Sequence, residues 1–156
     1  MSSHQIPPNQ SDWVFRGFSS PTTTPVPDEF FDVLAPLLKE AELRVVLYII
    51  RRTFGFKKNS DTISLHQMVD GITTKDGRVL DRGTGLSKPA VIKAVRSLAE
   101  HGIVVVTANQ SPEKGFEATT YSLNVLPSAI EGSPLLTKFT RASKPKQQAL
   151  VNEVYI

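Results

Sequence analysis

Apolar side chains recur at helical spacing between residues 41 and 54. Their spacing of three or four positions is that of one helix face, and they are Leu43, Val46, Leu47, Ile50 and Phe54. Gly55 follows them and is suited to a left-handed helix end. Because apolar positions cover most of the circumference, the pattern predicts a central core helix. We expect its solvent-facing side to be marked by Arg44, Arg51 and Arg52.

A second amphipathic helix is predicted from Ser87 to Gly102. Ser87 is suited to cap its amino end, and Pro89 lies in the first turn, where a missing amide hydrogen is harmless. Its apolar face consists of Val91, Ala94, Val95 and Leu98.

Shorter elements are predicted around these two helices. A helix begins at Asp28 and is broken or kinked at Pro36. Another begins after Ser64 and ends near Gly71, and a polar connection, residues 56–62, precedes it.

Turn signals and β-branched runs predict the rest of the domain. The Asp76–Gly77 pair indicates a hairpin or an ordered loop. Runs rich in β-branched residues at 103–108 and 118–125 predict an antiparallel hairpin, with residues 111–115 at its tip.

The composition divides the chain into three parts. Residues 1–27 are rich in Pro, Ser, Thr and Asn, which predicts an extended arm. Residues 28–126 contain the predicted helices and strands and form one domain. Residues 127–156 form a polar, basic tail, and its last segment, ALVNEVYI, fits a peptide that binds a partner by folding on contact.

Length and residue content exclude several classes of protein. A chain of 156 residues has room for one domain and not for a large multidomain assembly. The absence of cysteine excludes disulfides, zinc–thiolate sites and a cysteine nucleophile. The sequence has no apolar run long enough for a membrane span and no secretory signal at its start, so we expect a cytoplasmic protein without membrane association.

Short helices followed directly by a two-stranded hairpin are the element order of a winged helix. We therefore predict an α+β fold, a winged helix-turn-helix that is mainly helical and has a C-terminal β-hairpin wing. The helix from Ser87 to Gly102 takes the place of the recognition helix, because a DNA major groove about 12 Å wide admits one helix.

The outward positions of this helix are the candidate DNA contacts. They are Ser87, Lys88, Pro89, Ala90, Lys93 and Arg96. We expect Lys88 to contact a phosphate, and Lys93 and Arg96 to contact base edges or the DNA backbone. Lys114, at the wing tip, is expected to contact a flanking phosphate or the minor groove. A basic helix face is also common as a merely solvated surface.

Two further basic clusters are present. One consists of Arg51, Arg52, Lys57 and Lys58, with no acidic residue between positions 43 and 60. These cations fit phosphate contacts, and they equally fit stabilisation of a helix carboxyl end. The other lies in the tail, where it adds either nonspecific affinity for nucleic acid or solubility, and consists of Lys138, Arg141, Lys144 and Lys146.

A catalytic site is poorly supported by the sequence. His4, His66 and His101 lack metal-ligand spacing, and no nucleotide-binding or hydrolase motif is present. We therefore expect no enzymatic activity, no metal site and no cofactor.

Four segments within residues 28–126 form one recognisable set. They are EFFDVLAPLLKEAELRVVLYIIRRTFGF, ISLHQM, GTGLSKPAVIKAVRSLAEHGIVVV and ATTYSLNV. Together they resemble the amino-terminal winged-helix domain of bacteriophage replication protein O and related replisome organisers. The resemblance implies binding to repeats at a replication origin, with Ser87 to Arg96 supplying recognition. It also implies a separate carboxyl part that recruits the replicative helicase or its loader.

One segment departs from the simplest members of that family. The insertion TTKDGRVLDRG, from Thr73 to Gly83, lengthens the link between the two helices of the helix-turn-helix. It is either a hairpin that adds contacts or a structural elaboration.

The predicted function is non-catalytic binding of double-stranded DNA in the replication of a phage or mobile element. Its DNA site is expected to be either repeated or palindromic, and a palindromic site would be bound by a homodimer. A winged-helix transcriptional regulator with the same surface is the second hypothesis. A protein-interaction adaptor, whose partner capture is insensitive to salt, is the third.

Overall fold

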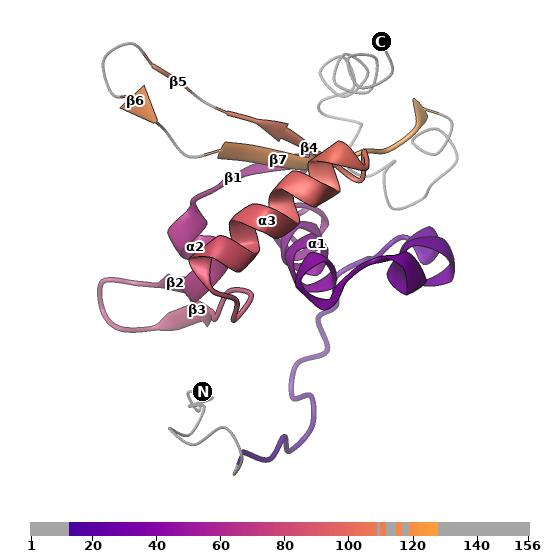
Figure 1. Ribbon diagram of the computed structural model, residues 1–156. Helices are drawn as coiled ribbons and strands as arrows, with labels where there is room; N and C mark the ends of the chain where they lie inside the picture. The colour runs from indigo at the N-terminus through magenta and orange to yellow at the C-terminus, as the bar shows by residue number, and fades with distance from the viewer. Residues whose placement is uncertain (1–12, 109, 112–114, 117–118, 128–156) are drawn as a thin grey trace.

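The fold combines two crossed helices with a small antiparallel sheet (Figure 1). The computed structural model describes residues 13–108, 110–111, 115–116 and 119–127. The helical segments are η2 (Phe30–Leu34), η3 (Ala35–Leu37), α1 (Glu40–Arg52), η4 (Phe54–Phe56), α2 (Leu65–Asp70) and α3 (Lys88–Glu100). The strands are β1 (Ser60–Ile63), β2 (Ile72–Thr73), β3 (Val79–Asp81), β4 (Val104–Thr107), β5 (Gln110–Ser111), β6 (Gly115–Phe116) and β7 (Thr119–Leu123).

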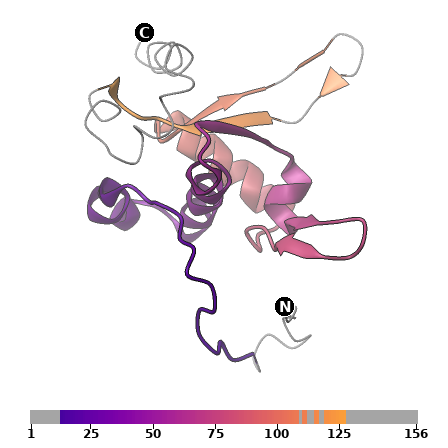
Figure 2. The ribbon, with the colours of Figure 1, turned by 180° about the vertical axis from the view of Figure 1, so that it is seen from behind.

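Helix α1 is the centre of the core, as predicted, but its buried face differs in part from the predicted one, because Leu47 is 40% exposed whereas Val45 and Ile49 are buried. Val45, Val46, Ile49 and Ile50 are at most 1% exposed, because the core side of the helix packs against α3, β1 and β7. Figure 2 shows the same helix from behind, with the extended residues 13–27 leading up to η2 beside it.

The sheet has the strand order β1–β7–β4, and all its pairs are antiparallel. The predicted hairpin is confirmed by the pairing of β4 with β7, in which Val106 lies opposite Tyr121. The prediction of a polar connection over residues 56–62 was wrong in its second half, because Ser60–Ile63 forms β1 and pairs with β7. Of these four residues only Ile63 is buried, so the strand has little apolar pattern of its own.

The helix predicted from Asp28 to Pro36 forms in a different way. It consists of one turn of π-helix, η2, and a 3₁₀ turn, η3. Pro36 lies in η3 and has no amide hydrogen to donate, which prevents a regular α-helix from continuing.

The insertion between α2 and α3 is a hairpin, one of the two forms predicted for it. Ile72 pairs with Asp81, and Thr73 pairs with Val79. The order helix, strand, helix, inserted hairpin, helix and hairpin, with a β1–β7–β4 sheet, is a winged-helix-like α+β fold. Within the part of the chain that is described, no helix is both long and apolar enough to cross a membrane.

Candidate nucleic-acid interface

Helix α3 is held on the core by its inner face, and its amino end is capped by its own chain. Val91, Ala94 and Leu98 are buried, as the apolar pattern predicted. The Ser87 hydroxyl accepts a hydrogen bond from the Ala90 backbone amide at 3.3 Å, which satisfies one free donor at the helix amino end. The Ser87 side chain therefore caps the helix, although the residue is exposed.

The outer face of α3 is basic and exposed to solvent. Lys88, Pro89, Lys93 and Arg96, all predicted as outward residues, are exposed and lie on one stripe of the helix. Ala90 is only half-buried and lies at the edge of that stripe. The stripe also contains Ile92, which is 42% exposed and which the sequence prediction did not name.

The cations of α3 are free of partners within the described residues. Lys88, Lys93 and Arg96 make no side-chain hydrogen bond or ion pair with any of those residues, and Glu100 is the one acidic residue of α3. An unpaired cation keeps its donors and its charge available for an incoming anion. We call the exposed stripe of Lys88, Pro89, Ile92, Lys93 and Arg96 the α3 face.

Most cations of the second predicted cluster are engaged in contacts within the protein. Arg51 is exposed, but its guanidinium lies 4.5 Å from the centre of the Phe56 ring and hydrogen-bonds to the Gly55 carbonyl oxygen at 3.4 Å. The ammonium of Lys58 forms an ion pair with Asp61 at 3.4 Å. Lys57 is exposed and has a left-handed backbone conformation.

The expectation that Arg52 lies on the solvent side of α1 was wrong, because the residue is buried. It is 9% exposed, and its guanidinium pairs with Asp61 at 2.9 Å. The same group donates to the Tyr48 hydroxyl at 3.1 Å and to Gln67 Oε1 at 3.4 Å. Arg52 thus connects α1, β1 and α2 inside the molecule, and we exclude it from the candidate surface.

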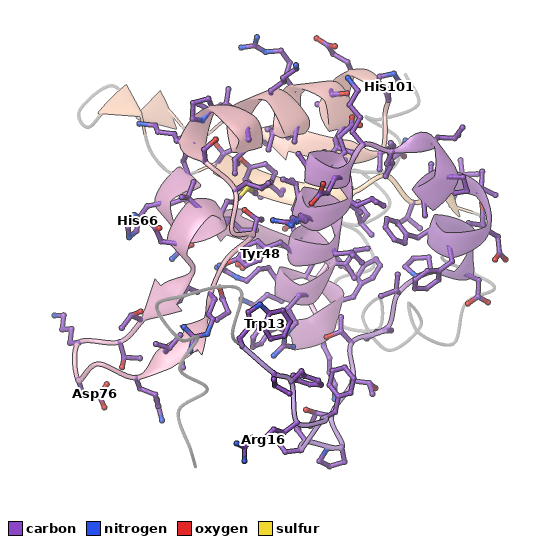
Figure 3. The ribbon with its side chains drawn as sticks, turned by 60° about the horizontal axis from the view of Figure 1, so that its bottom comes forward. Trp13, Arg16, Tyr48, His66, Asp76 and His101 are labelled. Carbon is purple, nitrogen blue, oxygen red and sulfur yellow. The ribbon has the colours of Figure 1, made fainter. Side chains whose placement is uncertain are left out.

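The position of Arg51 and Lys57 also separates them from the α3 face. Glu42, in the first turn of α1, hydrogen-bonds to Ser97 of α3, whereas Arg51 lies nine positions further along, about 13 Å at helical rise. Figure 3 shows α3 crossing one end of α1. The cluster therefore lies toward the other end of α1, away from that crossing.

The wing tip lies partly outside the described residues. Strands β5 and β6 pair with each other beyond β4 and β7, with Gln110 opposite Phe116. Lys114, the predicted contact at the tip, is outside the described residues, as are residues 128–156 with their basic cluster.

The contact between Glu42 and Ser97 fixes α3 on α1. Glu42 is 7% exposed, and one carboxylate oxygen accepts the Lys39 backbone amide at 2.8 Å. The other oxygen accepts the Ser97 hydroxyl at 2.5 Å. These hydrogen bonds, that from Ser97 foremost, lower the pKa of Glu42 below its ordinary value, although burial opposes the shift.

This contact makes stability depend on pH. Because the pKa of Glu42 is lower in the folded state, its contribution is present above the unfolded pKa and is lost as the pH falls through the folded pKa. Ser97→Ala is expected to cost about 1–2 kcal/mol at pH 7, since it removes a charge-assisted hydrogen bond. Urea unfolding of the unmodified protein and of the Ser97→Ala variant at pH 7 and pH 3 measures this cost. The difference in their free energies of unfolding should be smaller at pH 3 than at pH 7. An equal difference at both values would contradict the role given to this pair.

Comparison with known proteins gives one match. The family model for bacteriophage replication protein O matches residues 24–114, which is more than half of the chain. Comparisons with curated proteins and with solved structures gave no match. The matched residues include α1, α2, the inserted hairpin and all of α3. The chain therefore belongs to the bacteriophage replication protein O family, which assigns it a function related to phage replication.

Proposed function

We propose that this protein binds double-stranded DNA at a phage replication origin, without catalysis and without a cofactor. The observation that supports this most is the α3 face, where Lys88, Lys93 and Arg96 are exposed and unpaired within the described residues. The other helix of this length, α1, has its cations paired or stacked, or buried in the case of Arg52. The contrast favours an external anion as the partner of α3.

Binding in this proposal has two stages. Lys and Arg side chains first neutralise backbone phosphates and release condensed counterions, so that affinity falls steeply with salt. The α3 face then enters the major groove, where Arg96 and Lys93 donate to base edges and Lys88, beside the helix amino end, contacts a phosphate. Ile92 lies between these cations on the exposed stripe and is suited to contact a thymine methyl group.

Ser87 has a changed role relative to the sequence prediction. Its hydroxyl already accepts the Ala90 amide, so in this proposal it holds the first turn in place rather than recognising DNA. Recruitment of a helicase or its loader by residues 127–156 stays a prediction of the resemblance.

The test of the proposed function uses the full chain and fragments of phage DNA. Fragments retained by the protein are sequenced and are expected to come from one region that contains repeats, within the replication origin. Affinity for a 30-base-pair duplex from that region should fall with added salt, with a slope of about −0.9 for each phosphate contacted. No retained duplex, or binding that salt leaves unchanged, would favour the adaptor hypothesis. Enrichment of promoter fragments would favour a transcriptional regulator.

A further inference from the structure

The inserted hairpin β2–β3 is anchored firmly on the core. The two oxygens of the Asp81 carboxylate accept the Tyr48 hydroxyl at 3.1 and 3.3 Å, and one of them also accepts the Gly83 backbone amide at 2.8 Å. Tyr48 in turn accepts a hydrogen bond from Arg52, which pairs with Asp61. The hairpin is therefore connected through Asp81 to the internal polar network of α1 and β1.

The base of the hairpin is also closed by backbone contact. The Thr84 amide and hydroxyl both donate to the Met68 carbonyl oxygen, at 2.8 and 2.7 Å. Gly71 and Gly83 lie so close that a Cβ on Gly71 would be 2.5 Å from the Gly83 nitrogen. At the other end the turn is closed by the Thr74 amide, which donates to the Arg78 carbonyl oxygen at 2.8 Å. These contacts hold the hairpin in a defined direction.

The exposed charge of the hairpin is positive. Lys75, Arg78 and Arg82 are exposed, and their side chains make no hydrogen bond or ion pair with the rest of the described chain. The hairpin also contains two acidic residues. Asp81 accepts a hydrogen bond from Tyr48, and only Asp76 is exposed to solvent. Three cations therefore face solvent against one acid.

The hairpin extends on the same side of the molecule as the amino end of α3. In all three views β2–β3 and the β5–β6 end of the wing extend to one side, with the amino end of α3 between them (Figures 1, 2 and 3). Segments η2 and η3 lie on the opposite side in Figures 1 and 2. A helix in a major groove has a phosphate backbone on each side of it, so arms on either side of α3 are placed to meet them.

We propose that the β2–β3 hairpin is a second DNA-binding arm, in which Lys75, Arg78 and Arg82 contact backbone phosphates beside the groove that α3 enters. This inference rests on the proposed function, since it takes duplex DNA as the ligand. The hairpin adds affinity and fixes the orientation of α3, and it adds little sequence discrimination, because phosphates are the same in every sequence.

The first test compares salt dependence on a 30-base-pair duplex of mixed sequence. Lys75→Ala/Arg78→Ala is expected to reduce the salt slope by about 1 to 2 and to weaken binding about tenfold or more at 0.1 M salt. Arg16→Ala/Lys39→Ala removes the same net charge from exposed positions outside the hairpin and should leave the slope nearly unchanged. Circular dichroism of each variant checks that the fold is kept.

The second test measures proximity directly. Because the chain contains no cysteine, Asp76→Cys provides a single attachment point for an iron chelate that cleaves nearby DNA. We expect this conjugate to cut the duplex, and a Leu37→Cys conjugate on η3 to cut it much less. Equal cutting by both, together with an unchanged slope in the Lys75→Ala/Arg78→Ala variant, would overturn the second arm alone. Absence of salt-dependent binding by the unmodified protein would overturn the proposed function as well.

Discussion

Replacing Lys93 and Arg96 together by alanine is expected to weaken binding to the origin duplex at least about tenfold at 0.1 M salt. Loss of a base contact costs about 1–3 kcal/mol, and loss of a phosphate contact lowers the salt slope by about 1. Both side chains are exposed and unpaired within the described residues, so the fold should keep its stability to within about 0.5 kcal/mol. Fluorescence anisotropy of a labelled duplex across a salt series measures the effect.

A charge-matched control separates location from net charge. Arg16→Ala/Lys39→Ala also lowers the charge by two, but both residues lie outside the α3 face and the hairpin. If the two double variants lose affinity equally, the binding is a response to net charge and the α3 face has no special part in it. A loss confined to Lys93→Ala/Arg96→Ala supports the assignment.

The second large effect is expected from Gly71→Ala, which should destabilise the domain by about 3 kcal/mol or more. A Cβ at this position would lie 2.2 Å from the Asp81 carbonyl oxygen, and that atom belongs to backbone that has little room to move. The residue also has φ 82° and ψ −158°, a conformation that is nearly restricted to glycine. Urea unfolding followed by circular dichroism is the suitable measurement, because Trp13, the one tryptophan, is 56% exposed and lies in the extended arm.

Gly77→Ala is the matched control for this effect. Gly77 also has a positive φ, 91°, but no atom lies within 4 Å of a Cβ built there. We expect a loss of only about 1 kcal/mol, from the positive φ alone. Equal losses in the two variants would mean that the close approach at the base of the hairpin has no energetic weight.

The two long helices were predictable because their signals are local. The spacing of Val91, Ala94 and Leu98, together with the Ser87 cap, fixed both the extent and the inward face of α3. The same periodicity left Lys93 and Arg96 outside, and the structure has them there. Ile92 was assigned to neither face, although its position four residues from Lys88 and Arg96 places it on their stripe.

The errors arose where distant segments decide the structure. Strand β1 has only one buried side chain and pairs with β7, about sixty residues later, so a local pattern contains little sign of it. Arg52 was expected to face solvent because arginine is usually exposed. It is buried because Asp61 on that strand neutralises it, and predicting its position therefore required knowing β1 first.

The most direct measurement of the central claim is NMR mapping of the full chain as the origin duplex is added. The largest backbone amide shifts are expected along the α3 face, from Lys88 to Arg96, with the hairpin residues Lys75 and Arg78 also affected. Shifts gathered instead on η2 and η3, or no shifts while the duplex is in excess, would contradict the claim that this face of α3 is the DNA-binding surface.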